Sequence, residues 1–264
     1  MKCIICGGST EAYFTKDFLG RHGLGRVEYV RCGACGFVQS KTHLEMSDGE
    51  WGALNRAYHS YHGSQTNADD HRWVDRLQLQ ADVIAQAAEA GLLPRSAPWV
   101  DHGCGDGKLS ALLEARGLPT LKYEAYPPAG AQGYLTAAEF AARKYDLVIS
   151  TSVFEHVRSL ASLDEIAERV SASGVLAVHT MVCETVPRDA SWFYLIAVHC
   201  ALFSNESMRR LFMRWGYVAS LYQLESRLWF WFKHDSPALA EFARRSQAGG
   251  TVFHYKAGFM DYWK

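Results

Sequence analysis

Short apolar segments alternate with amphipathic helical segments along residues 97–235, and this alternation limits the possible fold more than any other feature of the chain. The runs "APWVDHG" (97–103) and "YDLVISTSV" (145–153) predict buried strands, whereas "KLSALLEARG" (108–117) has the apolar spacing of a helix and ends at a glycine. Strands that alternate with helices form a mostly parallel sheet with helices on both faces. We therefore predict an α/β fold with its ligand beyond the carboxyl ends of the strands.

The same criteria predict the remaining elements of this region. Further strands are expected at 119–126 and 175–182, and further helices at 69–91, 136–144, 159–174 and 204–216. The runs "YVASLYQLE" (217–225) and "RLWFWFKHD" (227–235) are close enough to pair as a hairpin. A hairpin at the end of a parallel sheet indicates an antiparallel edge strand.

Two cysteine pairs at the start of the chain have the spacing of metal ligands. Cys3 and Cys6 form one C-x2-C pair, Cys32 and Cys35 form the other, and a glycine follows each pair. Glycine lets the chain turn so that backbone amides point at the thiolates. Four thiolates in this arrangement form a closed tetrahedral zinc site, which stabilises a segment too short to bury a core of its own. We therefore predict a zinc ribbon whose Zn²⁺ is structural.

Composition and charge argue against several classes of protein. With 264 residues, of which 48% are hydrophobic and 21% charged, the chain has an ordinary globular composition and not that of a disordered protein. A formal net charge of −1 disfavours a dedicated nucleic-acid binder. The N-terminus lacks a signal-peptide pattern, and the longest apolar run, residues 192–203, is too short to span a bilayer. We expect a cytoplasmic protein without a membrane segment, whose reduced thiols bind metal.

We predict four segments along the chain. Residues 1–45 form the zinc ribbon, with two strand-like runs around the turn "LGRHGLG". Residues 46–68 are polar and aromatic without a clear period, which is typical of a connecting loop or lid. Residues 69–235 form the main α/β domain, and residues 236–264 form a C-terminal extension.

The glycine-rich corner after the first strand of the α/β region does not match two common cofactor loops. The dinucleotide fingerprint G-x-G-x-x-G needs a third glycine where Lys108 stands. The phosphate loop needs a serine or threonine where Leu109 stands.

The pattern that remains is Asp101 followed by Gly103, Gly105 and Gly107. A carboxylate beside the loop repels a pyrophosphate but suits a cofactor that carries a cationic amino-acid group. The next strand leads to Glu124, whose carboxylate can accept hydrogen bonds from both hydroxyls of a ribose. A cofactor with a ribose, an ammonium group and no phosphate is S-adenosylmethionine.

These segments carry a family resemblance. "VDHGCGDG", Glu124, "YDLVISTSVFEHV" and "SGVLAVHT" together resemble the class I S-adenosylmethionine-dependent methyltransferases, over roughly residues 70–235. The resemblance implies their Rossmann-like sheet. It also implies that Asp101 and the glycines face the methionine part of the cofactor, that Glu124 holds the ribose, and that residues around Leu135 flank the adenine. The predicted cofactor contacts are Asp101, Gly103, Gly105, Glu124, Leu135, Thr136 and Ser150.

Glu155 and His156 follow the strand at 145–153, beside the place expected for the transferred methyl group. An alcohol acceptor must lose its proton, and we predict His156 as the general base, oriented or polarised by Glu155. The pair is similar to the catalytic pair of zinc-ribbon sugar C-methyltransferases. In the alternative interpretation, the pair caps a helix or supports the cofactor. The predicted acceptor contacts are Tyr58, Tyr61, His179, Trp192 and His199.

A zinc ribbon in front of such a domain resembles two groups of methyltransferases. One group methylates sugars or other polyhydroxyl metabolites, and the other methylates a base in ribosomal RNA. The near-neutral charge and the "FEHV" segment favour the first group, so we predict a small-molecule or glycan acceptor, such as a sugar, a nucleotide sugar or a polysaccharide-pathway metabolite. The alternatives are a ribosomal RNA methyltransferase and, in another class, a non-catalytic scaffold that binds S-adenosylmethionine and zinc.

Overall fold

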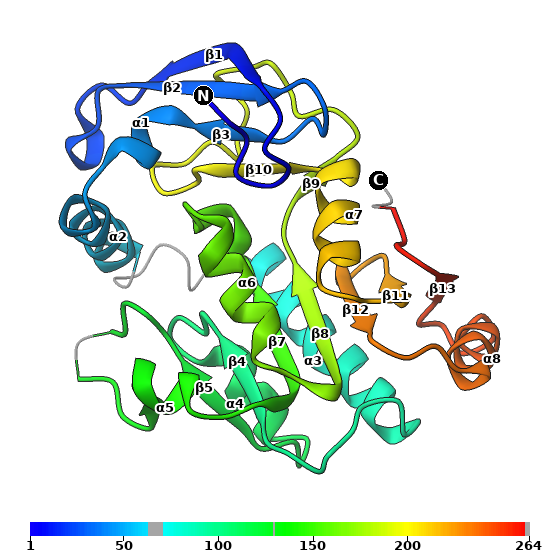
Figure 1. The fold of residues 1–264 in the computed structure, drawn as a ribbon. Helices are drawn as coiled ribbons and strands as arrows, with labels where there is room; N and C mark the ends of the chain where they lie inside the picture. Colours follow the sequence, from blue (N-terminus) through cyan, green and yellow to red (C-terminus); the bar gives the residue numbers. More distant parts are fainter. Residues whose placement is uncertain (63–70, 129, 262–264) are drawn as a thin grey trace.

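The computed structural model describes residues 1–62, 71–128 and 130–261, with the side chains of residues 60–62 and 71–74 left out. Its strands form two sheets, one of five strands and one of eight (Figure 1). None of the helices in these described ranges is long and apolar enough to cross a membrane.

The eight-stranded sheet confirms the predicted α/β fold. Its order is β13-β11-β12-β8-β7-β4-β5-β6. The strands are β4 (Trp99–His102), β5 (Thr120–Tyr123), β6 (Tyr134–Leu135), β7 (Tyr145–Thr151), β8 (Val170–His179), β11 (Ala219–Gln223), β12 (Leu228–Phe232) and β13 (Phe253–Ala257). Strands β4 to β8 pair in parallel, whereas β12 pairs antiparallel with both β8 and β11. The predicted hairpin is therefore present. Strand β13, from the C-terminal extension, adds an outermost antiparallel strand beyond it.

Helices cover both faces of this sheet because alternate strand residues point to opposite sides. On one face, Val148 and Trp231 share a buried cluster with residues of α5, α6 and α7. On the other, Leu147 and Phe230 share a second cluster with residues of α3, α4 and α8. The helices are α3 (His71–Glu89), α4 (Lys108–Glu114), α5 (Ala137–Ala141), α6 (Leu160–Glu168), α7 (Asn205–Arg214) and α8 (Pro237–Ser246).

The helix predicted at 159–174 is too long, because α6 ends at Glu168 and β8 begins at Val170. Val170 already pairs with Tyr145 of β7. At Gly174 a Cβ would lie 2.9 Å from the carbonyl oxygen of Tyr145, so the two strands approach closely there. This strand pairing, which is tertiary, overrides the helical pattern of the last five residues.

The loop predicted within residues 46–68 is also wrong over the part that the structure describes, since α2 (Asp48–His62) is a helix. A capping box begins it: the Glu50 carboxylate accepts from the Ser47 backbone N at 2.8 Å, and Ser47 Oγ accepts from the Glu50 N at 3.3 Å. Trp51 and Leu54 are buried, and Tyr58 is partly buried on the same side. The Ser-x-x-Glu signal and this helical spacing were both present in the sequence.

The five-stranded sheet joins the predicted ribbon to a distant part of the chain. Its order is β1-β2-β3-β10-β9 (Figure 1). The strands are β1 (Thr10–Asp17), β2 (Arg26–Cys32), β3 (Val38–Ser40), β9 (Val182–Cys183) and β10 (Ala201–Ser204), with a 3-10 turn η1 (Arg21–Gly23) between β1 and β2 and the short helix α1 (Lys41–Glu45) after β3. Strand β3 pairs antiparallel with β10, and β10 pairs in parallel with β9. The ribbon therefore continues into the segment between β8 and α7.

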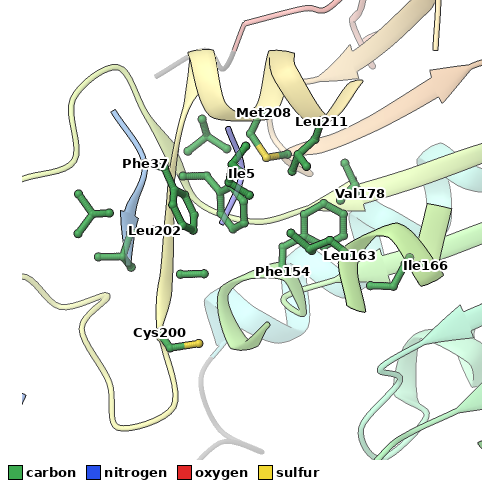
Figure 2. Close-up of a cluster of buried hydrophobic side chains, with 14 of the residues drawn as sticks. Ile5, Phe37, Phe154, Leu163, Ile166, Val178, Cys200, Leu202, Met208 and Leu211 are labelled. Atoms are coloured by element: carbon green, nitrogen blue, oxygen red, sulfur yellow. The ribbon is translucent and has the colours of Figure 1, made fainter. Parts of the chain in front are cut away.

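A common apolar core lies between the two sheets. Figure 2 shows Ile5 and Phe37 of the ribbon beside Leu202 of β10, together with side chains of α6 and α7 and with Phe154. Phe203 links the two sides, because its ring centroid lies 5.0 Å from Phe37 and 6.0 Å from Phe154.

Ser204 ties α7 to the ribbon, and we expect its loss to destabilise both. Its Oγ accepts from the Ser207 N at 3.1 Å as the helix cap and donates to the Cys35 carbonyl. Ser204→Ala should lower the free energy of unfolding by about 2–3 kcal/mol, since it removes a cap and leaves a buried carbonyl unpaired. Ser159→Ala removes the cap of α6 and an exposed hydrogen bond with Ser162 Oγ but leaves no buried carbonyl unpaired, so it should lower the free energy of unfolding by about 1 kcal/mol. Urea unfolding of both variants measures the difference, and equal losses would contradict this role of Ser204.

Candidate active site

A glycine corner follows β4 and brings three loops together. Gly103 has a φ of +71°, and a Cβ there would lie 2.4 Å from Cγ2 of Val153, which follows β7. The corner therefore packs directly against the segment that leads to Glu155 and His156. Gly105 has a φ of +55°, and its N donates to Glu124 Oε2 at 2.9 Å. The structure thus unites the carboxyl ends of β4, β5 and β7, as the fold predicts.

Two carboxylates flank this corner. Asp101 is 1% exposed, and Ser110 Oγ donates to its Oδ2 at 2.9 Å. Burial raises the pKa of Asp101 to about 7, and the nearby charge of Glu124 adds to this shift. Glu124 also accepts from the Tyr126 N at 3.0 Å, which fixes the direction of its carboxylate. A cation bound beside Asp101 would favour its ionised form.

A cavity of about 330 Å³ opens beside Glu124. Its lining includes Leu135 of β6 and Thr136, so three of the predicted cofactor contacts share one hollow. The Thr136 side chain accepts from the Glu139 N as the cap of α5. Ser150 lies elsewhere: it is fully buried within β7, and its Oγ has no hydrogen-bond partner in the described part of the chain.

The Glu155 carboxylate is held from both sides. Glu155 belongs to the 3-10 turn η2 (Phe154–His156) and is 1% exposed. Thr180 Oγ1 donates to its Oε2 at 2.8 Å, and the Tyr194 hydroxyl donates to its Oε1 at 2.6 Å. Hydroxyl donors on both oxygens stabilise a buried carboxylate. Sequence reasoning missed Thr180. Tyr194 lies in the same segment as Trp192 and His199, where the acceptor site is expected, but its hydrogen bond to Glu155 was not predicted.

Three histidines from three segments meet beside Glu155. The rings of His156 and His199 are edge-to-face, with centroids 4.8 Å apart, and the ring of His59 on α2 lies 5.9 Å from His156. A carboxylate oxygen of Glu155 and one ring nitrogen each of His156 and His199 all lie within 4.8 Å of one another. The His199 Nδ1 lies 2.7 Å from the Tyr194 carbonyl. Because a carbonyl only accepts, the proton of neutral His199 is on Nδ1 and its Nε2 carries a lone pair.

Burial lowers the pKa of His156 and of His199 to about 3, so both imidazoles are neutral near pH 7. His199 lowers the pKa of His156 further, whereas the negative charge of Glu155 opposes the shift. His156 Nδ1 is buried, with no hydrogen-bond partner among the described residues. The cluster therefore offers unprotonated nitrogens in a water-poor place. The lowered pKa makes each imidazole a weaker base, and the negative charge of Glu155 offsets part of this effect at His156.

The other predicted acceptor contacts lie at different distances from this cluster. The Trp192 ring is 5.4 Å from Tyr194, whose ring is 4.4 Å from His199, so Trp192 belongs to the same wall. Tyr58 is partly buried on α2, with its ring 5.6 Å from His59. The Tyr61 side chain lies outside the described residues.

His179 ends β8, where its Nδ1 lies 2.9 Å from the carbonyl oxygen of Arg227. This hydrogen bond joins the ring to the turn between β11 and β12, not to the histidine cluster. A role for His179 in binding the acceptor stays a prediction.

The four N-terminal cysteines converge. Distances between their Sγ atoms are 3.7 Å for Cys3 to Cys35 and 3.5 Å for Cys6 to both Cys32 and Cys35. A tetrahedral zinc ion with Zn–S bonds of about 2.3 Å requires sulfurs about 3.8 Å apart. The thiol positions therefore fit Zn²⁺ closely.

The turns around the thiols also match the prediction. Gly7 and Gly36 each have a φ of +70°, a left-handed conformation that glycine adopts without strain. The backbone N–H of Gly8 bonds to the Cys6 sulfur, and that of Phe37 bonds to the Cys35 sulfur. Such amides stabilise thiolates.

Comparison with known proteins agrees with this geometry. Residues 71–220 match the family described as "Methyltransferase domain", which is more than half of the chain. The chain belongs to this family and is an S-adenosylmethionine-dependent methyltransferase. Among curated proteins, none matches the chain.

Several solved structures are similar to this chain at low identity. The 1,6-didemethyltoxoflavin-N1-methyltransferase of Burkholderia thailandensis is 14% identical, with 78% of this chain and 93% of that chain covered and a TM-score of 0.49. The magnesium protoporphyrin IX methyltransferase of Synechocystis PCC 6803 is 18% identical, with 69% and 94% covered and a TM-score of 0.44. DesVI of Streptomyces venezuelae is 16% identical, with 60% and 92% covered and a TM-score of 0.45.

We expect the buried histidines to make the protein sensitive to acid. Burial lowers the pKa of five of them to about 3 or 4: His43, His102, His156, His179 and His199. Unfolded histidine has a pKa of about 6.5, so below that pH the unfolded chain binds more protons than the folded one. The free energy of unfolding should therefore fall as the pH decreases from about 6.5 to 4, by up to about 1.4 kcal/mol per pH unit for each histidine.

Urea unfolding at about pH 7.5 and pH 5 measures this acid sensitivity. Asp101, whose raised pKa favours the folded state at lower pH, opposes the trend with a single group. His179→Gln should reduce the pH dependence, because it removes one of the five buried rings. A midpoint that does not move with pH would contradict the assignment of these rings as neutral.

Proposed function

We propose that this methyltransferase acts on a small polar acceptor, such as a sugar, a nucleotide sugar or a polysaccharide-pathway metabolite, with His156 as the general base. One observation carries the proposal: the tight packing of Gly103 against Val153 sets the cofactor corner beside a buried cluster of neutral imidazoles. Substrates of this class carry hydroxyl groups or acidic C–H groups, whose protons must be removed for methylation. A cluster of imidazoles supplies that chemistry.

The residues of the corner would hold S-adenosylmethionine in a defined orientation. Asp101, in its ionised form, would attract the ammonium group, and the free backbone at Gly103 and Gly105 would let the methionine part lie close to the chain. Glu124 would accept from both ribose hydroxyls, and Leu135 would pack against the adenine in the adjoining cavity. Bound there, the cofactor supplies a methyl group on a positively charged sulfur.

The proton that leaves the acceptor must be taken up and stabilised, and His156 and the residues that hold Glu155 would share these roles. The acceptor gains a methyl group and loses a proton, which passes to an unprotonated nitrogen of His156. Glu155 favours the imidazolium that forms, because its negative charge raises the pKa of His156. Tyr194 and Thr180 keep the carboxylate in place throughout. Most of the rate would come from this positioning and from the exclusion of water.

We further propose that Cys3, Cys6, Cys32 and Cys35 hold a structural zinc ion. Their spacing fits the tetrahedral Zn–S geometry, and all four positions of the shell are taken by sulfur. No position is left for water or substrate, so the ion would stabilise the ribbon without taking part in methyl transfer.

Glu124 provides a direct test of the cofactor site. Glu124→Ala should weaken the binding of S-adenosylhomocysteine by about 100-fold, because two charge-assisted hydrogen bonds to the ribose are lost. Glu114→Ala, at the exposed end of α4, is the matched control and should bind normally. Isothermal titration calorimetry measures both. Equal affinity of the two variants would exclude the proposed ribose contact.

His156 provides the test of the acceptor chemistry. With a panel of nucleotide sugars as acceptors, His156→Ala should lower turnover by about 10²–10⁴-fold and leave the affinity for S-adenosylhomocysteine unchanged. Substitution of the exposed His234 should change neither quantity. Full turnover by the His156 variant would rule out its role as the base. Methylation of ribosomal RNA, with no activity on the sugars, would overturn the proposed acceptor class.

A further inference from the structure

The ribbon reaches the catalytic segment through the backbone. Beyond the pairing of β3 with β10, the Ser40 N donates to the Cys200 carbonyl at 2.8 Å. The Cys200 N in turn donates to the Glu155 carbonyl at 2.8 Å. A continuous path of hydrogen bonds therefore runs from the end of β3 to the residue before His156.

His43, which lies just after β3, forms a second and tighter link. It is fully buried, with Nδ1 2.6 Å from Ser40 Oγ and Nε2 2.9 Å from the Ala197 carbonyl. Because that carbonyl only accepts, His43 carries its proton on Nε2, and its Nδ1 accepts from Ser40. Its ring also meets Trp51 of α2 edge-on, with centroids 5.6 Å apart. One imidazole thus joins the ribbon, the segment that carries His199, and α2.

Other ribbon side chains hold the same segment. The Tyr13 hydroxyl donates to the Val186 carbonyl at 2.6 Å, and Arg188 Nε donates to the Tyr13 carbonyl at 2.7 Å. At the tip of the ribbon, the His22 ring lies 5.3 Å from Tyr58 of α2. The ribbon therefore contacts both walls of the histidine cluster.

The side chains of the cofactor corner have hydrogen-bond partners outside the ribbon. Asp101 accepts from Ser110, and Glu124 accepts from the backbone of Gly105 and of Tyr126. These partners belong to the loops and helices of the eight-stranded sheet. Within the described residues, the hydrogen bonds that shape the cofactor corner do not involve the ribbon.

From this division we infer that the ribbon is the positioning element of the acceptor side: its zinc-bound form holds Tyr194, His199 and Glu155 in place, and His43 is the residue through which it acts. The inference rests on the proposed function in two respects, the structural zinc ion of the ribbon and the naming of that side after the acceptor. The zinc ion would therefore stabilise the histidine cluster but not the S-adenosylmethionine corner. This positioning role gives the ribbon a function that does not require binding of RNA.

Hydrogen–deuterium exchange with and without zinc tests the inference on the full chain. Removal of zinc by a chelator should speed exchange by about tenfold or more in residues 192–204, while residues 99–103 and 120–124 keep their rates. The affinity for S-adenosylhomocysteine should stay within about twofold. Unchanged exchange at 192–204 would overturn the inference, and so would a loss of S-adenosylhomocysteine binding together with zinc.

Variants of His43 separate its role from that of the metal. With zinc bound, His43→Phe fills the space but removes both hydrogen bonds, and it should reproduce the faster exchange at 192–204 with normal S-adenosylhomocysteine affinity. His43→Gln can still donate to Ala197 and should restore part of the protection. His234→Phe is the exposed control. Full protection in the His43→Phe variant would refute the assignment of His43.

The two proposals can fail separately. Exchange and S-adenosylhomocysteine binding need no acceptor, so inactivity toward every sugar tested leaves this experiment intact. Retention of the chain on ribosomal RNA that depends on zinc, without any change at 192–204, would assign the ribbon to RNA recognition and overturn the inference.

Discussion

The absence of a side chain at position 103 is the constraint on which the site depends. Val153 occupies the place where a Cβ would stand, so the corner after β4 and the segment after β7 are in direct contact. The same corner leaves its backbone open toward Glu124, which binds the N–H of Gly105. A bulkier residue would push these loops apart. The distance from Asp101 and Glu124 to His156 is therefore set by the packing of the Gly103 backbone against the Val153 side chain, which is stiff because it branches at Cβ.

The five-stranded sheet helps to bury the histidine cluster, and this burial keeps the imidazoles neutral. An exposed imidazole has a pKa of about 6.5 and is partly protonated near neutrality. Cover by the ribbon, α2 and the segment before β10 lowers the pKa of His156 and His199 to about 3, which keeps both neutral. The same cover leaves the Glu155 carboxylate dependent on its two hydroxyl donors. The five-stranded sheet has little apolar core of its own. It thus completes a site that the eight-stranded sheet alone would leave open to water.

Local signals in the sequence account for much of this structure. The alternation of strands and helices, the Asp101 glycine corner and the cysteine spacing each depend on neighbouring residues, and the structure contains all three. Helix α2 also had a local signal, its capping box at Ser47, which the polar and aromatic composition obscured. The pairing of β3 with β10 had none, because it joins two short strands far apart in the chain. His43 reaches the Ala197 carbonyl only through that pairing, and Tyr194 reaches Glu155 only through the tertiary fold, so neither contact could be deduced from spacing.

We propose that the corner formed by Asp101, Gly103 and Glu124 binds the charged nucleoside cofactor. Titration calorimetry with S-adenosylhomocysteine between about pH 5 and 8 tests it most directly, since burial raises the pKa of Asp101 to about 7 and the ligand's ammonium group requires the ionised form. The affinity should rise by up to about tenfold per pH unit until about pH 7 and then level off, with protons released on binding at the acidic end. An affinity that does not depend on pH, or no heat of binding at any pH, would contradict the account.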